Sequence, residues 1–214
     1  AIFKSAAKWY ERYFDKHGRT KEAPNALMWA IVLRGGMGQE GRMRRNAASF
    51  IQRYGRRKLK LSAKAFWLVV KMYENQGDEN KLLINMSRYV RTYGKAGEVD
   101  KYLESLGRMG EMMWRRSCEK HTPIHGQCIK IIFYRRKGRK KKQKKIYFVE
   151  RNRRQVRSAK RYFNRVLGVW RNGFALKRIP KNDAGRLDKI ANARHYAAHA
   201  AFMKAEFQFE EYLK

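Results

Sequence analysis

Acidic residues are scarce in this chain. Among 214 residues, 18 Asp and Glu face 52 Lys and Arg, so the net charge is +34. Clustered positive charge repels itself unless a polyanion neutralises it, which favours nucleic acid as the partner over an anionic membrane surface or an acidic protein. The same scarcity argues against hydrolysis and phosphoryl transfer, because both usually need paired carboxylates or a metal site. We therefore expect no enzymatic activity and no small-molecule substrate.

Proline, cysteine and long apolar runs are also rare. The three prolines, Pro24, Pro123 and Pro180, stand at expected boundaries between elements, and their sparseness favours long helices. Two cysteines in a chain of this length argue against a disulfide scaffold and fit a reducing compartment. Because no apolar run approaches the length that spans a bilayer, we expect no membrane insertion.

Hydrophobic residues nevertheless make up 43% of the chain and aromatic residues 13%, which predicts a folded core. In the first half, apolar residues recur at helical spacing between glycines, so the expected fold is mainly α. The predicted helices span residues 5–17, 24–35, 40–54, 63–76, 79–93 and 98–116. Ser62 and Asp78 are the expected N-caps of the fourth and fifth helices. The first helix is expected to bury one face, formed by Ala6, Trp9, Tyr10, Tyr13 and Phe14.

These helices repeat. The sequence Phe-Ile-Gln-Arg-Tyr-Gly at 50–55 is echoed 39 positions later by Tyr-Val-Arg-Thr-Tyr-Gly at 89–94, and Trp29 and Trp67 lie 38 positions apart. A period of this length, built of two helices with glycine turns, is typical of an α-solenoid. The expected architecture of the first half is therefore a set of α-solenoid-like helical hairpins.

The segment from Tyr93 to Met109 resembles the middle and second helix of a pentatricopeptide repeat, with an aromatic residue, a glycine turn and an amphipathic helix. The resemblance covers residues 25–116 and implies hairpins of the pentatricopeptide or tetratricopeptide kind, from a family that reads single-stranded RNA. The period is longer than the family's, and no proline separates the repeats. We therefore infer the helical-hairpin architecture from this resemblance, and we assign no base-reading residues.

Composition changes sharply after the sixth predicted helix, and we expect four parts. Residues 1–117 form a helical-repeat body, 118–128 a Cys/His linker, 129–178 a basic β-hairpin with an Arg-rich helix, and 179–214 a long C-terminal helix. The last helix itself is predicted over 184–213. Its expected apolar face consists of Leu187, Ile190, Ala197, Ala198, Ala201, Phe202, Ala205, Phe209 and Leu213.

The basic part carries more than half of the net charge. Residues 129–178 hold 20 Lys or Arg and one acid, Glu150. The β-branched and aromatic segments 129–134 and 146–149 predict two strands. They flank the stretch 135–145, in which nine of eleven residues are cationic. A helix is predicted over 150–172, with most of its cations on one face. The expected RNA-binding residues are Arg135, Arg136, Lys137, Arg139, Lys140, Lys141, Lys142, Lys144, Lys145, Arg151, Arg153, Arg154, Arg157, Lys160, Arg161 and Arg165.

Two features of this region allow more than one interpretation. The cationic stretch 135–145 also has the composition of a nuclear import signal. The aromatic residues nearby either stack on bases or belong to the core. These aromatic residues are Tyr134, Tyr147, Phe148, Tyr162 and Trp170.

Cysteine and histidine cluster in the linker. Cys118, His121, His125 and Cys128 fall within eleven residues, and all four are residue types that ligate zinc. The insert between the two pairs is shorter than in ordinary zinc fingers. The alternative to a zinc site is a polar linker with two free thiols, and no other cofactor is expected.

Together, the charge and the repeats predict a structural ribosomal protein. Pentatricopeptide-like repeats are similar to those of some mitochondrial ribosomal proteins. That resemblance implies a place in the mitochondrial matrix, with ribosomal RNA and other ribosomal proteins as partners. Two alternatives stay open. One is a free pentatricopeptide-class RNA-processing or translation factor, and the other is a nuclear or nucleolar nucleic-acid-binding protein.

Overall fold

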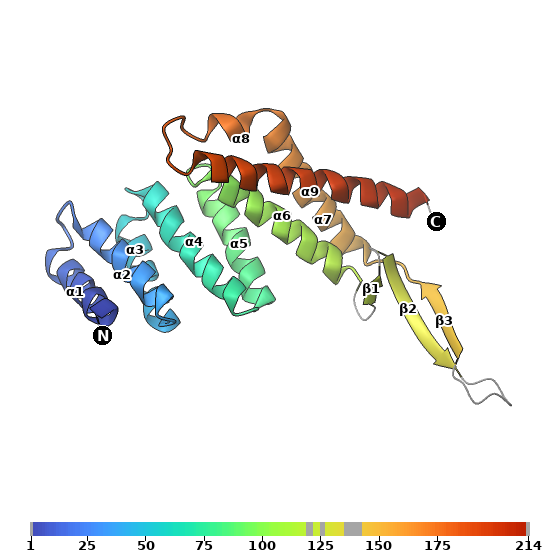
Figure 1. Ribbon diagram of the computed structural model, residues 1–214, viewed down its shortest axis with the longest axis horizontal. Helices are drawn as coiled ribbons and strands as arrows, with labels where there is room; N and C mark the ends of the chain where they lie inside the picture. The colour runs from blue at the N-terminus through green and yellow to red at the C-terminus, as the bar shows by residue number, and fades with distance from the viewer. Residues whose placement is uncertain (1, 119–121, 125–126, 135–142, 213–214) are drawn as a thin grey trace. The chain divides into compact units, whose positions relative to one another are not determined.

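The computed structural model describes residues 2–118, 122–124, 127–134 and 143–212, and this part of the chain is mainly helical, as predicted. Figure 1 follows the elements along the chain. The chain divides into two compact units, Ala1–Ser105 and Leu106–Lys214, and the division falls inside helix α6 (Val99–Arg116).

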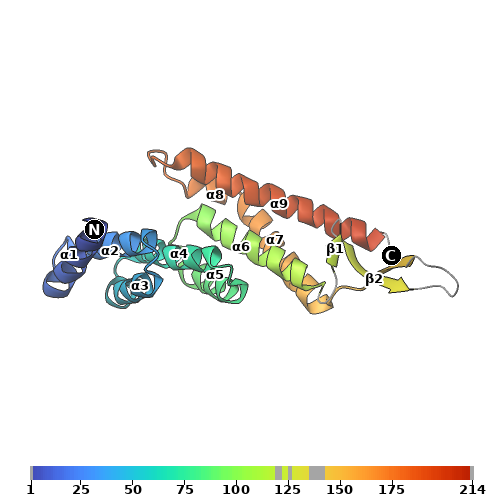
Figure 2. The same cartoon turned by 60° about the horizontal axis from the view of Figure 1, so that its bottom comes forward.

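The first unit consists of helices that pack on their neighbours in sequence. Each helix from α1 to α5 contacts the next, and α2 also contacts α4. Figure 2 shows the five helices in succession. Their bounds are Ile2–His17 for α1, Ala23–Gly36 for α2, Glu40–Tyr54 for α3, Leu59–Asn75 for α4 and Glu79–Tyr93 for α5.

The core of the first unit contains most of the predicted apolar residues of α3, α4 and α5. Phe50, Val70, Met86 and Tyr89 are all buried. Asp78 caps α5 as predicted, because its Oδ1 accepts a hydrogen bond from the backbone N–H of Lys81 at 3.0 Å. The three-four spacing of apolar residues was therefore a good guide to these three helices.

Two local predictions in this unit are wrong. Helix α4 begins at Leu59 with Lys58 at the N-cap, so Ser62 lies buried inside the helix and does not cap it. On α1 the buried residues are Ala7 and Phe14, whereas Trp9 is 59% exposed. The aromatic side chains of α1 project from several sides of the helix. Their spacing alone therefore did not identify the face that packs.

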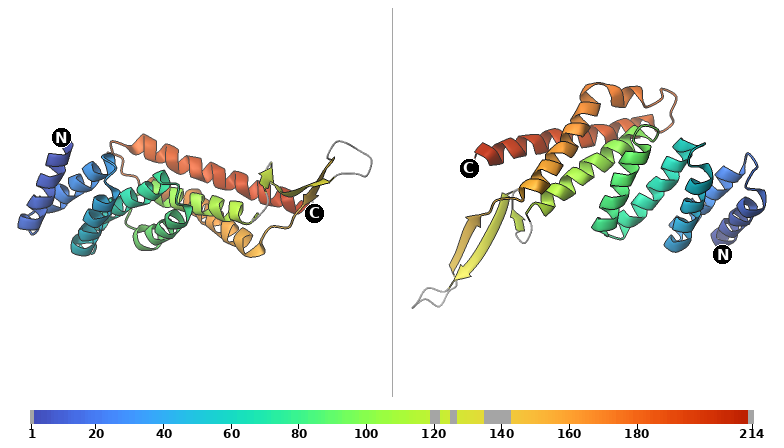
Figure 3. Two further views of the ribbon diagram at one scale, coloured as in Figure 1. Left: turned by 90° about the horizontal axis from the view of Figure 1, so that it is seen from below. Right: turned by 180° about the vertical axis from the view of Figure 1, so that it is seen from behind.

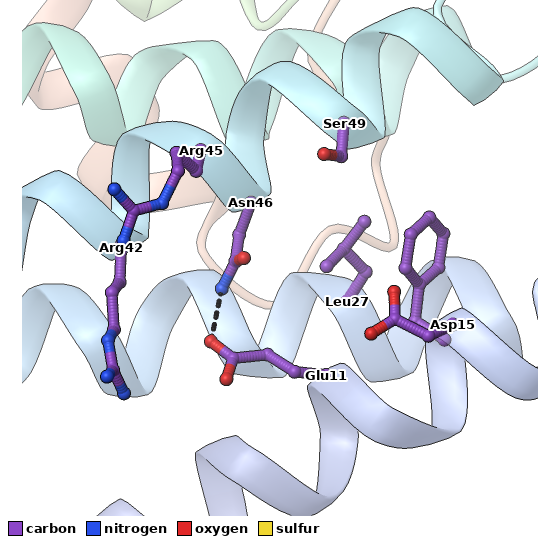
Figure 4. A pocket seen from close by; sticks show the side chains of 8 residues that line it. Glu11, Asp15, Leu27, Arg42, Arg45, Asn46 and Ser49 are labelled. Atoms are coloured by element: carbon purple, nitrogen blue, oxygen red, sulfur yellow. Dashed lines mark hydrogen bonds between the residues drawn. The ribbon is translucent and has the colours of Figure 1, made fainter.

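A charged group lies inside the first unit. The Arg34 side chain is fully buried and donates hydrogen bonds to both Glu11 carboxylate oxygens, from Nε at 2.8 Å and from Nη2 at 2.6 Å. Its Nη1 donates to Gln39 Oε1 at 2.6 Å. Asn46, on α3, donates to Glu11 Oε1 at 2.8 Å, as Figure 4 shows. These bonds join α1, α2 and α3 and supply the partners that a buried guanidinium requires.

The same hydrogen bonds shift the pKa values of both Glu11 and Arg34. The hydrogen bond from Arg34, aided by that from Asn46, lowers the pKa of Glu11 below its ordinary value despite the opposing effect of burial. The hydrogen bond to Glu11 in turn raises the pKa of Arg34. Both groups are therefore held in their charged forms at neutral pH.

The second unit contains the end of α6, a small sheet and three helices. The bounds are Thr122–Ile124 for β1, Gln127–Tyr134 for β2, Gln143–Phe148 for β3, Arg153–Arg171 for α7, Phe174–Lys177 for α8 and Arg186–Tyr212 for α9. Helix α7 packs on α8 and α9, and Figure 3 shows α7 and α9 from two sides. Neither β1 nor α8 was predicted.

The sheet has the strand order β1-β2-β3 and is antiparallel throughout. In its register Ile129 lies opposite Phe148, and Tyr134 lies opposite Gln143. Strand β3 begins at Gln143, three residues before the predicted strand. The part of the cationic stretch at 135–142 lies outside the described residues.

Two glycines of α6 allow aromatic rings from α7 and α9 to approach its backbone. A Cβ added to Gly107 would lie 2.5 Å from Cδ1 of Tyr196 on α9. A Cβ added to Gly110 would lie 2.8 Å from Cζ of Phe163 on α7. Both distances are shorter than van der Waals contact, so only glycine leaves room for these rings.

The structure overturns the predicted apolar face of α9. Phe202 is 59% exposed and Phe209 57% exposed, and Leu187 is exposed as well. The opposite face of α9 is the one that packs. Of its buried residues, only Ala197 belongs to the face predicted from the sequence. The buried residues of α9 are Ala193, Tyr196, Ala197, Ala200, Met203 and Phe207. Apolar side chains occur on both faces of this helix, so periodicity could not choose between them.

We expect Glu11→Gln to destabilise the fold by about 3 kcal/mol, because it leaves the buried Arg34 charge without its counter-charge. Because the pKa of Glu11 is lowered in the folded state, its contribution is present above the ordinary pKa and is lost as the pH falls through the lowered value. Urea denaturation should therefore show a difference between wild type and variant that shrinks in acid. The control Asp15→Asn removes the same charge from an exposed site on α1, and an equal loss there would contradict the role of Arg34.

We expect Gly110→Ala to destabilise the fold by about 1–3 kcal/mol, because the new methyl group meets the Phe163 ring. Gly168→Ala on α7 is the matched control, since an added Cβ meets no atom within 4 Å there. Alanine is the better helix former, so the control should gain about 0.5–1 kcal/mol. Thermal denaturation of both variants checks the opposite signs, and a neutral Gly110→Ala would rule out the close contact.

Candidate nucleic-acid interface

Helix α7 has one buried face and one cationic face. It begins after Asn152, whose side-chain oxygen accepts hydrogen bonds from the backbone N–H groups of Arg154 at 3.1 Å and Gln155 at 3.3 Å. The residues buried on α7 are Ala159, Phe163, Val166 and Leu167. Burial of this face turns the opposite side of the helix toward solvent.

The cations on that side form a continuous surface, which we call the α7 basic face. Its members are Arg153, Arg154, Arg157, Lys160, Arg161 and Arg165, and all are exposed except the half-buried Lys160. At 1.5 Å per residue they extend over about 18 Å of helix. That length matches about five phosphates of one nucleic-acid strand at 3.4 Å each.

Two carboxylates approach this face. Glu150 lies 3.8 Å from Nη2 of Arg153, with both side chains largely exposed. Glu211 of α9 pairs with Lys160. Exposed ion pairs of this kind are weak, so a phosphate can replace the carboxylate. The face therefore offers exposed guanidinium groups, and a guanidinium can bind phosphate oxygens with two parallel hydrogen bonds.

Nine other predicted contacts lie in β3 or outside the described residues. Lys144 and Lys145 belong to β3, where they lie opposite Phe133 and Ile132 of β2. Seven predicted contacts lie outside the described part of the chain. They are Arg135, Arg136, Lys137, Arg139, Lys140, Lys141 and Lys142.

Arg151 differs from the other predicted contacts, because it is only 7% exposed. Its guanidinium carbon lies 3.7 Å from the centre of the Trp114 ring, a cation–π contact. Its Nη1 donates hydrogen bonds to the Trp114 carbonyl and the Ser117 hydroxyl, both at 3.2 Å. Arg151 thus ties the segment before α7 to the end of α6. Arg153, Arg154 and Arg157 follow it closely in the sequence, so nothing in the pattern distinguished Arg151 from these other arginines.

The predicted Cys/His cluster contains a disulfide in this structure. Cys118 and Cys128 are bonded to each other, with a Cα–Cα distance of 5.4 Å, whereas free thiols were expected. Bonded sulfurs do not serve as thiolate ligands, so zinc binding at these cysteines requires the reduced chain. His121 and His125 lie outside the described residues. Among the residues that the structure describes, no group of three or more His, Cys, Asp or Glu side chains is placed to hold a metal ion.

The disulfide also connects α6 to the sheet. The backbone N–H of Val149, just after β3, donates to the Cys128 carbonyl at 2.9 Å. The N–H of Asn152 donates to the Ser117 carbonyl at 2.8 Å. Together these links attach the strands and the start of α7 to the end of α6, and so they position the α7 basic face beside the strands.

The structure describes the side chains of two of the five aromatic residues that were expected near RNA. Tyr162 and Trp170 are half-buried on α7, a position compatible with either packing or stacking. The side chains of Tyr134, Tyr147 and Phe148 lie outside the described part of the structure. Sequence analysis did not single out Trp114, which forms the platform for Arg151.

We expect Arg151→Ala to lower the free energy of unfolding by roughly 2 kcal/mol, since it removes a buried cation–π contact and two hydrogen bonds. Arg151→Lys should recover only part of the loss, because an ammonium group lacks the planar surface that stacks on Trp114. Arg154→Ala, on the exposed face of α7, is the control and should stay within about 0.5 kcal/mol of wild type. Equal stabilities of Arg151→Ala and Arg154→Ala in urea denaturation would contradict the anchoring role.

No helix among the described residues is both long and apolar enough to cross a bilayer. Comparison of the chain with protein-family models, curated proteins and solved structures finds no match. The resemblance to pentatricopeptide repeats therefore stays a prediction from the sequence.

Proposed function

We propose that the chain is a structural, non-catalytic RNA-binding component of a ribonucleoprotein particle. The observation that carries this proposal is the α7 basic face, which follows directly after β2 and β3. The sequence that connects these strands is itself densely cationic. The two cationic segments are consecutive in the chain, so they can bind neighbouring phosphates of one RNA.

Electrostatics gives the physical reason. Exposed cations on a helix contribute little to folding, and at this density they repel one another. Phosphates relieve that repulsion and release condensed counterions, which favours binding to RNA over the free state. No comparable benefit comes from a small ligand, because it cannot neutralise charges spread over the whole length of α7.

The finer architecture belongs to the same proposal. We infer that β2 and β3, with the stretch between them, act as a basic β-hairpin extension that enters RNA. Helices α1 to α5 act as α-solenoid-like hairpins, and their consecutive packing supports this assignment. Contacts of each helix with its sequence neighbours are the pattern expected of stacked repeats.

A protein partner is also part of the proposal. An apolar stripe of α9 is exposed, and its residues follow one another at intervals of 4, 3, 4 and 3. They are Ala198, Phe202, Ala205, Phe209 and Tyr212. This is the spacing of a helix that packs against another helix. Such a stripe is expected to contact a neighbouring protein of the particle.

We propose the ribosome as the particle and the mitochondrial matrix as its location, with ribosomal RNA and other ribosomal proteins as the partners. Support comes from the charge of +34, from the paired strands with their cationic connection, and from the resemblance of residues 25–116 to pentatricopeptide repeats. The exposed α9 stripe favours an assembly component over a free RNA-processing factor. A free factor is the second candidate, and it requires a chain that stays monomeric and selects RNA sequences.

Removal of cations should change how RNA affinity depends on salt. We expect deletion of 135–145, or alanine at Arg154, Arg157, Arg161 and Arg165, to flatten the plot of log affinity against log salt. The expected change is about 0.7–0.9 per lost phosphate contact. Filter binding or fluorescence anisotropy with a labelled RNA fragment, at several salt concentrations, measures the slope.

The matched control removes four exposed cations from α1, as Lys4→Ala, Lys8→Ala, Arg12→Ala and Lys16→Ala. This variant has the same net charge as the α7 variant. An equal slope for the two variants would mean that bulk charge, and not the α7 basic face, attracts the RNA.

Isolation of the native protein with its bound RNA identifies the particle. Release as a monomer in a mild salt wash would exclude a ribosomal component.

A further inference from the structure

The second unit contains a cavity beside the α7 basic face. Its volume is about 320 Å³. Residues from the end of α6, the start of α7 and the end of α9 line it. The cavity lies where the basic face begins, because Arg153 and Arg157 belong to both.

The interior of the cavity is aromatic and apolar. The rings of Trp114 and Phe207 meet edge to face, with centroids 4.5 Å apart. Val156 contributes an aliphatic wall from α7. The Arg151 guanidinium, stacked on Trp114 and held by two hydrogen bonds, adds a flat cationic surface. Flat, weakly hydrated surfaces of this kind favour a planar ligand.

The rim of the cavity is positively charged. Arg153, Arg157 and Lys160 surround it, and Glu211, which pairs with Lys160, is the one carboxylate among the described residues of the lining. Arg153 and Arg157 are exposed, so they can reach an anion at the mouth, although Glu150 already lies 3.8 Å from Nη2 of Arg153. The cavity thus combines an apolar interior with a cationic entrance.

We propose that this cavity binds one unstacked nucleotide of the RNA strand that lies on the α7 basic face. The base enters between Val156 and the aromatic side chains, and its phosphate stays at the mouth with Arg153 and Arg157. The inference rests on the proposed RNA-binding function and assigns that function a base-binding site.

Size and chemistry favour this ligand. The volume lies near the lower end for small-molecule sites, about 300 Å³, so the cavity suits a group as small as one nucleotide. A free phosphate would leave the aromatic interior empty, and an uncharged apolar ligand would not use the cationic rim. Stacking on aromatic and guanidinium planes tolerates any base, so we expect little sequence preference.

The test compares two single-stranded probes of ten nucleotides, one an ordinary oligoribonucleotide and the other an abasic oligomer with the same number of phosphates. Binding of each to the full chain is measured by fluorescence anisotropy. The wild-type protein should bind the ordinary probe about tenfold more tightly, in line with the stacking of one base. Val156→Trp fills the cavity without a change in charge and should remove this preference.

Asn164→Trp is the matched control, because it places the same side chain on an exposed position of α7 outside the cavity. It should retain the wild-type preference. Since Val156→Trp could also disturb folding, a second measurement uses the wild-type chain. A probe with 4-thiouridine is cross-linked by ultraviolet light, and the cross-links should fall on Trp114, Val156 or Phe207.

The outcomes separate the two proposals. Equal binding of both probes by the wild-type protein, or cross-links only outside the cavity, would overturn the nucleotide site and leave the RNA-binding function intact. Failure to bind either probe would remove the RNA-binding function itself, and with it this inference. Retention of the preference by a folded Val156→Trp variant would also overturn the nucleotide site.

Discussion

Repulsion among 52 cationic side chains is the constraint on which this structure depends. Among the described residues two arginines, Arg34 and Arg151, are buried, and each is held by specific partners, a carboxylate in one case and an aromatic face in the other. Most other cations of the described helices project to solvent. Folding therefore needs few counter-charges inside the protein, and the remaining positive field is available to the RNA that we propose as the partner.

The two buried arginines solve the desolvation problem in different ways. Glu11 neutralises Arg34, so that site depends on the charge of a carboxylate and responds to acid. Trp114 offers Arg151 a polarisable face with no titratable group, and two neutral oxygens accept its N–H groups. The Arg34 site therefore includes a titratable counter-charge, whereas the Trp114 ring that faces Arg151 does not titrate.

Sequence reasoning succeeded where one face of a helix is apolar and the other is charged. The spacing of Phe50, Val70 and Tyr89 located buried faces, and the cationic residues of α7 fell on its exposed side. It failed where both faces are apolar, as on α9, because only tertiary contacts decide which face packs. It also could not foresee the Cys118–Cys128 bond or the Arg151–Trp114 contact, since both join residues across chain reversals.

The exposed apolar stripe of α9 affects the amount of this protein that a cell can maintain in its folded form. Phe202, Phe209 and Tyr212 form an exposed apolar surface, which favours self-association until another helix covers it. A partner that binds only the folded chain stabilises it by mass action. Copies made in excess of that partner would lack this protection and would be exposed to self-association and proteolysis. The supply of the partner, and not the rate of synthesis alone, would then set the abundance of the protein.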